Sequence, residues 1–203
     1  MGKTTERQAE IMDTAMNLIA KGGIQECTIR NIADAICLSE PAIYRHFNSK
    51  QDILLGILSG FSDLIRTMIS DIRAADSGAL NKIETFLERV SVTFTGKPII
   101  AAIVFSEEIF QNDGRLAQEV YSLMTKTRDG INKVLSDGQR NGEIRNDITH
   151  DQLSLMLMGS LRLLVTQWRL SGYSFKLTNE TRKLYKTIAI IFRSKSGSFQ
   201  AHR

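Results

Sequence analysis

The chain has 203 residues, enough for one medium-sized domain or two small ones with a sizeable core. Hydrophobic residues make up 42% and charged residues 24%, as in soluble globular proteins, and the two cysteines, Cys27 and Cys37, are too few for a disulfide framework. The net charge of +4 does not locate a nucleic-acid surface, because basic and acidic side chains balance through residue 50. No signal region and no membrane-spanning apolar run is evident, so we expect a cytoplasmic protein.

Three short helices are predicted before residue 49. The first covers about residues 4–20 with one apolar face, and Gly22-Gly23 ends it. Thr28 is placed to cap the second helix and Ser39 the third, since short polar side chains accept hydrogen bonds from the first helical amides. Pro41 falls in the first turn of the third helix, where the missing amide hydrogen is tolerated. Two short helices joined by about three residues have the outline of a helix-turn-helix.

A long helix is predicted next, over residues 49–74, where apolar residues recur every three or four positions. The stretch 98–110 is rich in β-branched residues, but the chain offers no other strand to pair with it, so a helix is preferred. The predicted fold class is all-α, with about nine helices. The same spacing places the remaining helices around residues 80–94, 98–110, 116–135, 153–170 and 184–192.

The third predicted helix carries Tyr44, Arg45 and His46 in succession. In a helix-turn-helix the second helix enters the major groove, while neighbouring elements contact phosphates. Arg45 suits a base edge, Lys50 suits a phosphate, and the methyl of Ala42 suits a thymine methyl. From the pattern alone, an ordinary amphipathic hairpin with a solvated polar face is an equal alternative. The candidate DNA-binding residues are Thr28, Arg30, Ser39, Glu40, Pro41, Ala42, Tyr44, Arg45, His46 and Lys50.

The segment TIRNIADAICLSEPAIYRHFNSKQDIL, residues 28–54, resembles the DNA-binding segment of the TetR family of transcriptional regulators. That segment typically has a Thr, then Ile-Ala, a turn, a Ser, Tyr-x-x-Phe and a Lys before an amphipathic helix. One departure is Cys37, where the family commonly has glycine. Glycine suits a left-handed turn residue, and a cysteine in that conformation costs about 1 kcal/mol. The matching residues are Thr28, Ile32, Ala33, Ser39, Ile43, Tyr44, His46, Phe47 and Lys50.

The resemblance implies a ligand-responsive transcriptional regulator, most simply a repressor that leaves a palindromic operator when an effector binds. It implies a DNA-binding domain over residues 1–48 and an effector-binding and dimerisation domain over residues 49–203, with the helix 49–74 connecting the two. The expected partners are double-stranded operator DNA, a second copy of the chain and a small hydrophobic effector. No membrane partner is expected.

The C-terminal part supplies candidates for effector binding and dimerisation. Helix 153–170 is apolar on nearly all sides and needs a second surface to bury against, which suits a four-helix dimer interface. Both assignments have alternatives: a filled core without a cavity, and helices buried against their own chain. The candidate pocket residues are Phe86, Phe94, Ile103, Phe110, Tyr121, Met124, Met156 and Trp168. The candidate interface residues are Leu157, Leu161, Leu164, Leu184, Ile188 and Ile191.

Two other classes of protein are compatible with an all-α chain. A metal-carboxylate enzyme needs a glutamate three residues before a histidine, and His46, His150 and His202 all lack one. No spacing suggests a nucleophile paired with a base. A helical adaptor, or a module that binds acidic membranes through its basic C-terminal helix, is the third class. We expect no enzyme activity, no catalytic residue, no cofactor and no metal.

Overall fold

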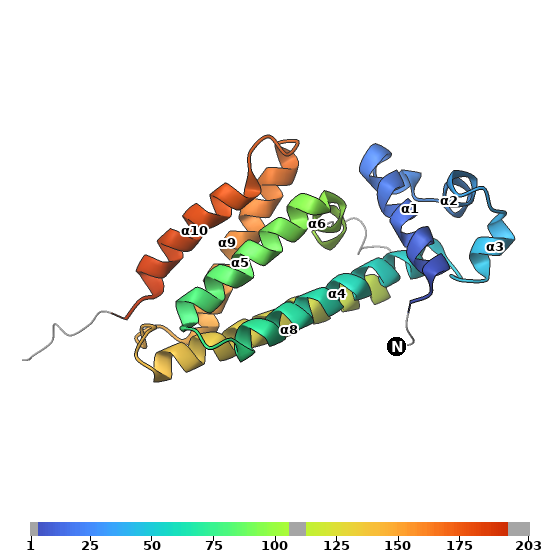
Figure 1. Cartoon of the computed structure of the whole chain (residues 1–203). Coiled ribbons are helices and arrows are strands. Elements are labelled where there is room, and N and C mark those ends of the chain that lie inside the picture. The colour runs from blue at the N-terminus through green and yellow to red at the C-terminus, as the bar shows by residue number, and fades with distance from the viewer. Residues whose placement is uncertain (1–3, 106–112, 195–203) are drawn as a thin grey trace, which may run out of the picture. The chain divides into compact units, whose positions relative to one another are not determined.

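The computed structural model describes residues 4–105 and 113–194 of the chain (Figure 1). Within these ranges the backbone forms nine α-helices and one 3-10 helix, η1, without any strand. The predicted all-α class is therefore confirmed. The elements are α1 (Glu6–Gly22), η1 (Ile24–Glu26), α2 (Ile29–Ala35), α3 (Glu40–Tyr44), α4 (Lys50–Ala74), α5 (Ala79–Gly96), α6 (Pro98–Val104), α8 (Gly114–Arg140), α9 (His150–Leu170) and α10 (Leu177–Phe192).

The described residues fall into two compact units. The first unit comprises those of Met1–Leu64 and Gly96–Leu123, and the second those of Ile65–Thr95 and Met124–Arg203. Helices α4 and α8 therefore each contribute residues to both units. The predicted functional boundary after residue 48 follows the DNA-binding motif. It stays a prediction, because compactness and function need not divide a chain at the same residue.

Local signals in the sequence fix the helices of the first unit. Thr5 forms a capping box with Gln8 at the start of α1, and Gly23, with a φ of 87°, follows its last residue. Helix α1 packs against α2 and α6. These contacts fix α2 and α3 on a small apolar core. That core contains Ile11, Ala15, Ile19, Ile32, Ala33, Ile43 and Ile53.

Helices α9 and α10 pack against each other in the second unit. Only one face of α9 is buried within its own chain, and the remaining apolar face is exposed. The apolar residues on all sides of α9 thus belong to two different surfaces: one face lies in the core, and the other is not covered by the rest of its own chain. The buried residues of α9 are Leu153, Ser154, Leu157, Leu161, Val165 and Trp168. Its exposed apolar residues are Leu155, Met156, Leu163 and Leu170.

Glu143, in the loop after α8, caps helix α5 from a distance of more than sixty positions along the chain. Its carboxylate accepts hydrogen bonds from the amides of Ala79 and Leu80, at 2.5 and 3.0 Å. A side chain at Gly78 would bring a Cβ within 2.7 Å of the same carboxylate, so the Glu143 side chain would have to shift. The backbone carbonyl of Glu143 accepts from the amide of Ser194 at 2.9 Å. One residue thus ties the start of α5 to the segment after α10.

Among the described helices, α4 is long and apolar enough to cross a bilayer by length and composition alone. Asp63 and Arg66 interrupt its apolar residues, so α4 is not the uninterrupted apolar run that the sequence lacks. Its most apolar window is 44% buried inside the protein, however, and core helices of soluble proteins pass the same test. Its buried residues are Ile53, Leu54, Ile57, Leu58, Phe61, Ile65, Met68, Ile69 and Ile72.

Candidate nucleic-acid interface and effector unit

Helix α2 begins at the predicted cap. The hydroxyl of Thr28 accepts a hydrogen bond from the amide of Asn31 at 3.0 Å, and the Asn31 side chain donates to the carbonyl of Glu26 at 3.0 Å. These two bonds fix the direction in which α2 leaves η1. Arg30, on the outer face of α2, is exposed, and among the described residues it forms only a long ion pair of 4.0 Å with Asp34. Its guanidinium therefore stays available to an outside anion.

The turn between α2 and α3 is a Schellman motif closed by a cysteine. The amide of Leu38 donates to the carbonyl of Ala33 at 2.9 Å, and the amide of Cys37 donates to the carbonyl of Asp34 at 3.3 Å. Cys37 has a φ of 54°, the left-handed region that favours glycine. The turn thus keeps the left-handed geometry that suits glycine, although this chain has a cysteine at the position. The thiol of Cys37 is exposed.

Helix α3 is shorter than the sequence suggests. It ends at Tyr44, and Arg45 is its C-terminal cap, so His46 lies in the turn that follows. Ser39 occupies the N-cap position, but its side chain makes no capping hydrogen bond. The carbonyl of His46 accepts from the side chain of Gln8 at 3.4 Å, which ties the end of this turn to α1. The residues after Tyr44 are held both by this tertiary contact and by the amides of His46 and Phe47, which donate to the carbonyl of Ile43 at 2.9 and 3.1 Å.

The exposed face of α3 presents Tyr44, whose side chain is 49% exposed, and Arg45 beside it. The side chain of Arg45 makes no ion pair or hydrogen bond within the part of the chain that the structure describes. A guanidinium without an internal partner can bind a phosphate or the edge of a guanine. Glu40 and Pro41 are exposed at the start of the same helix.

Two predicted DNA contacts need correction. Ala42 is only 7% exposed, because it lies on the face of α3 that packs on the core beside Ile43, so its methyl is not available to a thymine. Lys50 is half-buried, and its ammonium donates a hydrogen bond to the carbonyl of Ile24 at 2.8 Å. Lys50 thus connects the start of α4 to η1 instead of facing outward. Burial raises the pKa of the Cys27 thiol, and the charge of Lys50 opposes that shift.

The predicted pocket residues do not form one set. Phe86, Phe94, Ile103 and Trp168 are buried, as a pocket wall or a core requires. The exposed members are wrong as walls of an interior cavity in this structure, because their side chains face solvent. These are Tyr121, which is 67% exposed, Met124 and Met156. Phe110 lies outside the described residues.

Half of the predicted interface residues lie in the core of the second unit. Leu157, Leu161 and Ile188 are buried within their own chain and cannot face a second copy. Leu164 and Leu184 are half-buried, and Ile191 is exposed. The apolar side chains that do face outward were missed, because a helix that is apolar all round gives no signal for which face is covered. They are Leu155, Met156, Leu163 and Leu170 of α9 and Ile190 of α10.

Residues 11–57 match the family model described as "Bacterial regulatory proteins, tetR family", and residues 58–190 match the model "YsiA-like protein, C-terminal region". A nucleoid occlusion factor, SlmA from Photobacterium profundum, is 24% identical over 87% of this chain and 90% of its own length. A transcriptional repressor, KstR2 from Rhodococcus jostii, is 26% identical over 91% of this chain and 89% of its own length.

The same fold occurs in a transcriptional regulator, FadR from Bacillus subtilis, whose crystal structure contains stearoyl-CoA. The TM-score is 0.77 and the identity 19%, and the match covers 90% of this chain and 98% of that one. At this identity the likeness concerns the fold alone. It nevertheless extends over both compact units.

Proposed function

The chain belongs to the TetR family of bacterial regulatory proteins, and from this premise we propose which surfaces carry its function. The protein is a ligand-responsive, DNA-binding transcriptional regulator that acts as a homodimer on operator DNA. Its relatives named above are regulators and a nucleoid occlusion factor, and none is an enzyme by its description. We place it in the cytoplasm, where its DNA target lies.

The observation that carries the DNA-binding assignment is the helix pair α2–α3. A left-handed turn at Cys37 joins the two helices, and Arg45, the C-terminal cap of α3, has no ion pair or hydrogen bond from its side chain to any described residue. We assign base readout to Arg45 and Tyr44, and phosphate contacts to Thr28 and Arg30 on α2. The proposed contact set is Thr28, Arg30, Ser39, Glu40, Pro41, Tyr44, Arg45 and His46.

We propose that the dimer forms through the exposed apolar face of α9 and α10. Leu163 and Ile190 are 60% and 80% exposed, which is unusual for large aliphatic side chains in an isolated chain. A second copy would cover them through a two-fold symmetric four-helix contact. Two recognition helices held by one rigid dimer then read half-sites about 34–36 Å apart, or a multiple of that distance, so the operator is palindromic.

The proposed effector is a small hydrophobic molecule of the acyl-thioester class. Phe86, Phe94 and Trp168 give the second unit a large aromatic interior, which suits an apolar ligand better than a sugar or nucleotide. Stearoyl-CoA in the related FadR structure supports the class. An effector that binds the DNA-free state a hundredfold more tightly contributes about 2.7 kcal/mol per site, enough to empty an operator.

Fluorescence anisotropy at stated salt tests the proposal, with DNA from upstream of the protein's own coding sequence as the probe. We expect saturable, competitor-resistant binding that stearoyl-CoA reverses and free coenzyme A does not. Binding equal to that of unrelated DNA would contradict the regulator assignment at this operator. Specific binding that stearoyl-CoA leaves unchanged would contradict only the effector class.

A further inference from the structure

Three charged side chains join the starts of helices α4 and α8. The guanidinium of Arg115, in the first turn of α8, donates a hydrogen bond to the carboxylate of Asp52, in the first turn of α4, at 2.8 Å. Its other edge donates two hydrogen bonds to the carboxylate of Asp113, at 2.9 and 3.3 Å. A guanidinium that binds one carboxylate through two of its atoms is held in a fixed orientation. We call these three residues the Arg115 bridge.

The carboxylates of the Arg115 bridge are largely shielded from solvent. The side chains of Asp52 and Asp113 are 21% and 13% exposed, although that of Arg115 is 59% exposed. Asp113 also accepts a hydrogen bond from the amide of Arg115 at 2.8 Å, and the bonds from the Arg115 guanidinium hold the pKa of Asp113 below its usual range. The pair of Arg140 with Asp137 on the same helix has both side chains mostly exposed. The Arg115 bridge is therefore better fixed than such a surface pair.

The first turn of α4 is held by two other elements. Lys50 donates a hydrogen bond to the carbonyl of Ile24 in η1, which leads into α2, and Asp52 accepts one from Arg115 of α8. The amide of Asp52 donates to the hydroxyl of Ser49 at 3.1 Å, which fixes the turn that carries both residues. Polar contacts thus run from η1 through the first turn of α4 to the start of α8.

A second polar contact joins α8 to α4 farther along both helices. Glu119 accepts a hydrogen bond from the hydroxyl of Ser62 at 3.0 Å. Glu119 follows Arg115 by four residues, so both lie on the face of α8 that contacts α4. Ser62 lies about three turns beyond Asp52, however. Of these two contacts, only the Arg115 bridge reaches the first turn of α4.

We propose that Arg115 is a positioning residue for operator binding: through Asp52 it fixes the first turn of α4 on α8 and so holds the helix pair α2–α3 in place for the DNA. Arg115 acts through Asp52 and makes no contact with DNA in this role. The inference rests on the proposed DNA-binding function and adds to it a residue far beyond the helix-turn-helix. Without the bridge the reading helices sample more orientations, and ordering them on an operator then costs more free energy.

Fluorescence anisotropy of the full-length protein measures this effect on operator and on unrelated DNA. Arg115→Ala should raise the operator Kd about threefold or more and change the Kd for unrelated DNA far less. Asp52→Ala should raise the operator Kd by a similar factor, although removing a negative charge by itself strengthens binding to a polyanion. An operator Kd that Asp52→Ala leaves unchanged or lowers would overturn the proposal. Equal losses of Arg115→Ala on both DNAs would overturn it too, because they would indicate a direct phosphate contact.

The double variant, Asp52→Ala with Arg115→Ala, tests whether the two residues act through one contact. It should bind operator no more weakly than the weaker of the two single variants, since the second substitution removes nothing that the first has left intact. Losses that multiply in the double variant would show that the two side chains act independently. That result would overturn the Arg115 bridge as the cause.

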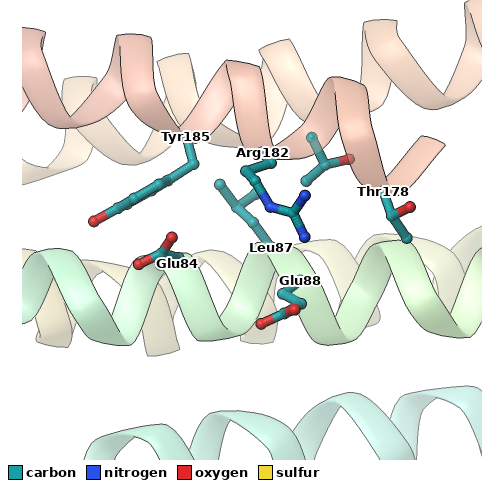
Figure 2. A pocket seen from close by; sticks show the side chains of 7 residues that line it. Glu84, Leu87, Glu88, Thr178, Arg182 and Tyr185 are labelled. Carbon is teal, nitrogen blue, oxygen red and sulfur yellow. The ribbon is translucent and has the colours of Figure 1, made fainter. Parts of the chain in front are cut away.

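Two arginines outside the Arg115 bridge supply matched controls. Arg140→Ala breaks the exposed pair with Asp137 near the other end of α8. Arg182→Ala removes a guanidinium from a hollow between α5 and α10 (Figure 2), which at about 50 Å³ has room for a few waters but not for an effector. Both substitutions remove the same charge as Arg115→Ala and should leave the operator Kd unchanged. A rise as large as that of Arg115→Ala would attribute the loss to charge alone and overturn the proposal.

Hydrogen exchange tests the Arg115 bridge without DNA. The amide of Ile53 bonds to the carbonyl of Ser49, so exchange at residues 53–55 reports on the first turn of α4. In Arg115→Ala these amides should exchange about threefold faster or more, while those of α10 keep their parental rates. Unchanged exchange at the start of α4 would overturn the proposal even if operator binding is weakened. A parent protein that binds operator no better than unrelated DNA would instead contradict the proposed function.

Discussion

The segment from α2 to α3 and the pair of helices α9–α10 contrast in how their sequences relate to their structures. In the first, single residues act locally: Thr28 caps a helix, Cys37 takes the left-handed turn, and Arg45 follows the last helical residue. In the second, the pattern is a continuous apolar helix whose faces differ only in what covers them. Local chemistry assigns individual positions, whereas hydrophobicity alone assigns an element and leaves its orientation open.

The largest expected effect distinguishes the two apolar faces of α9. Leu161, 4% exposed, and Leu163, 60% exposed, are two residues apart on the same helix. Leu161→Glu buries an unpaired carboxylate and should lower the free energy of unfolding by about 4 kcal/mol or more. Leu163→Glu should leave the monomer folded and abolish the dimer, because the charge then lies in the proposed interface.

Circular dichroism and sedimentation together measure both effects. Leu163→Gln is the matched control, since it removes the apolar side chain without adding a charge, and it should weaken the dimer less. A folded dimer of Leu163→Glu with wild-type affinity would show that this face is not the interface. A cooperatively folded Leu161→Glu protein would show that the buried face of α9 is misassigned.

Arg45→Ala tests the other region of the comparison, the segment from α2 to α3. The Arg45 side chain is exposed and makes no ion pair or hydrogen bond in the described structure, so we expect the Tm to be unchanged while operator affinity falls by about 1–3 kcal/mol. Arg30→Ala, on α2, should weaken binding to all sequences alike and reduce the salt dependence, as loss of a phosphate contact does. Anisotropy titrations of both variants over a range of salt concentrations distinguish a base contact from a phosphate contact. Equal losses on operator and unrelated DNA for Arg45→Ala would contradict base readout.

Glu143→Gln tests the cap of helix α5, which no local sequence pattern predicts. The glutamine keeps the shape but loses the charge that accepts from the amides of Ala79 and Leu80, so the free energy of unfolding should fall by about 1–2 kcal/mol. Glu180→Gln removes an exposed carboxylate paired with Lys183 and should cost less than about 0.5 kcal/mol. Urea denaturation measures the free energy of unfolding of both variants and of the parent protein. Equal midpoints for the two variants would show that the cap contributes nothing.

The contrast between Thr28 and Glu143 explains what the sequence could predict. The all-α class and the helix start at Thr28 depend on neighbours in the chain, and both are confirmed. The cap by Glu143 and the bond from Lys50 to the carbonyl of Ile24 join distant residues, so no local pattern predicts them. The sequence likewise does not tell which faces of α9 and α10 are covered, because burial depends on tertiary packing.

The smallest expected effect concerns Cys37, where this chain departs from the glycine common in its family. With a φ of 54°, its Cβ is held in a conformation that costs about 1 kcal/mol for most residues other than glycine. Cys37→Gly relieves that cost but also makes the unfolded chain more flexible, which offsets part of the gain. We therefore expect the free energy of unfolding to rise by no more than about 1 kcal/mol.

Cys37→Ala is the control for this substitution, since alanine removes the exposed thiol and keeps the Cβ. Thermal unfolding under reducing conditions should rank Cys37→Gly above the parent protein and place Cys37→Ala level with it. Because the Schellman bonds from Leu38 and Cys37 set the direction in which α3 leaves the turn, the glycine variant should bind operator with parental affinity. A glycine variant less stable than the parent would mean that the Cys37 side chain contributes more packing than its exposure indicates. The turn would then be specified by that contact as well as by backbone conformation.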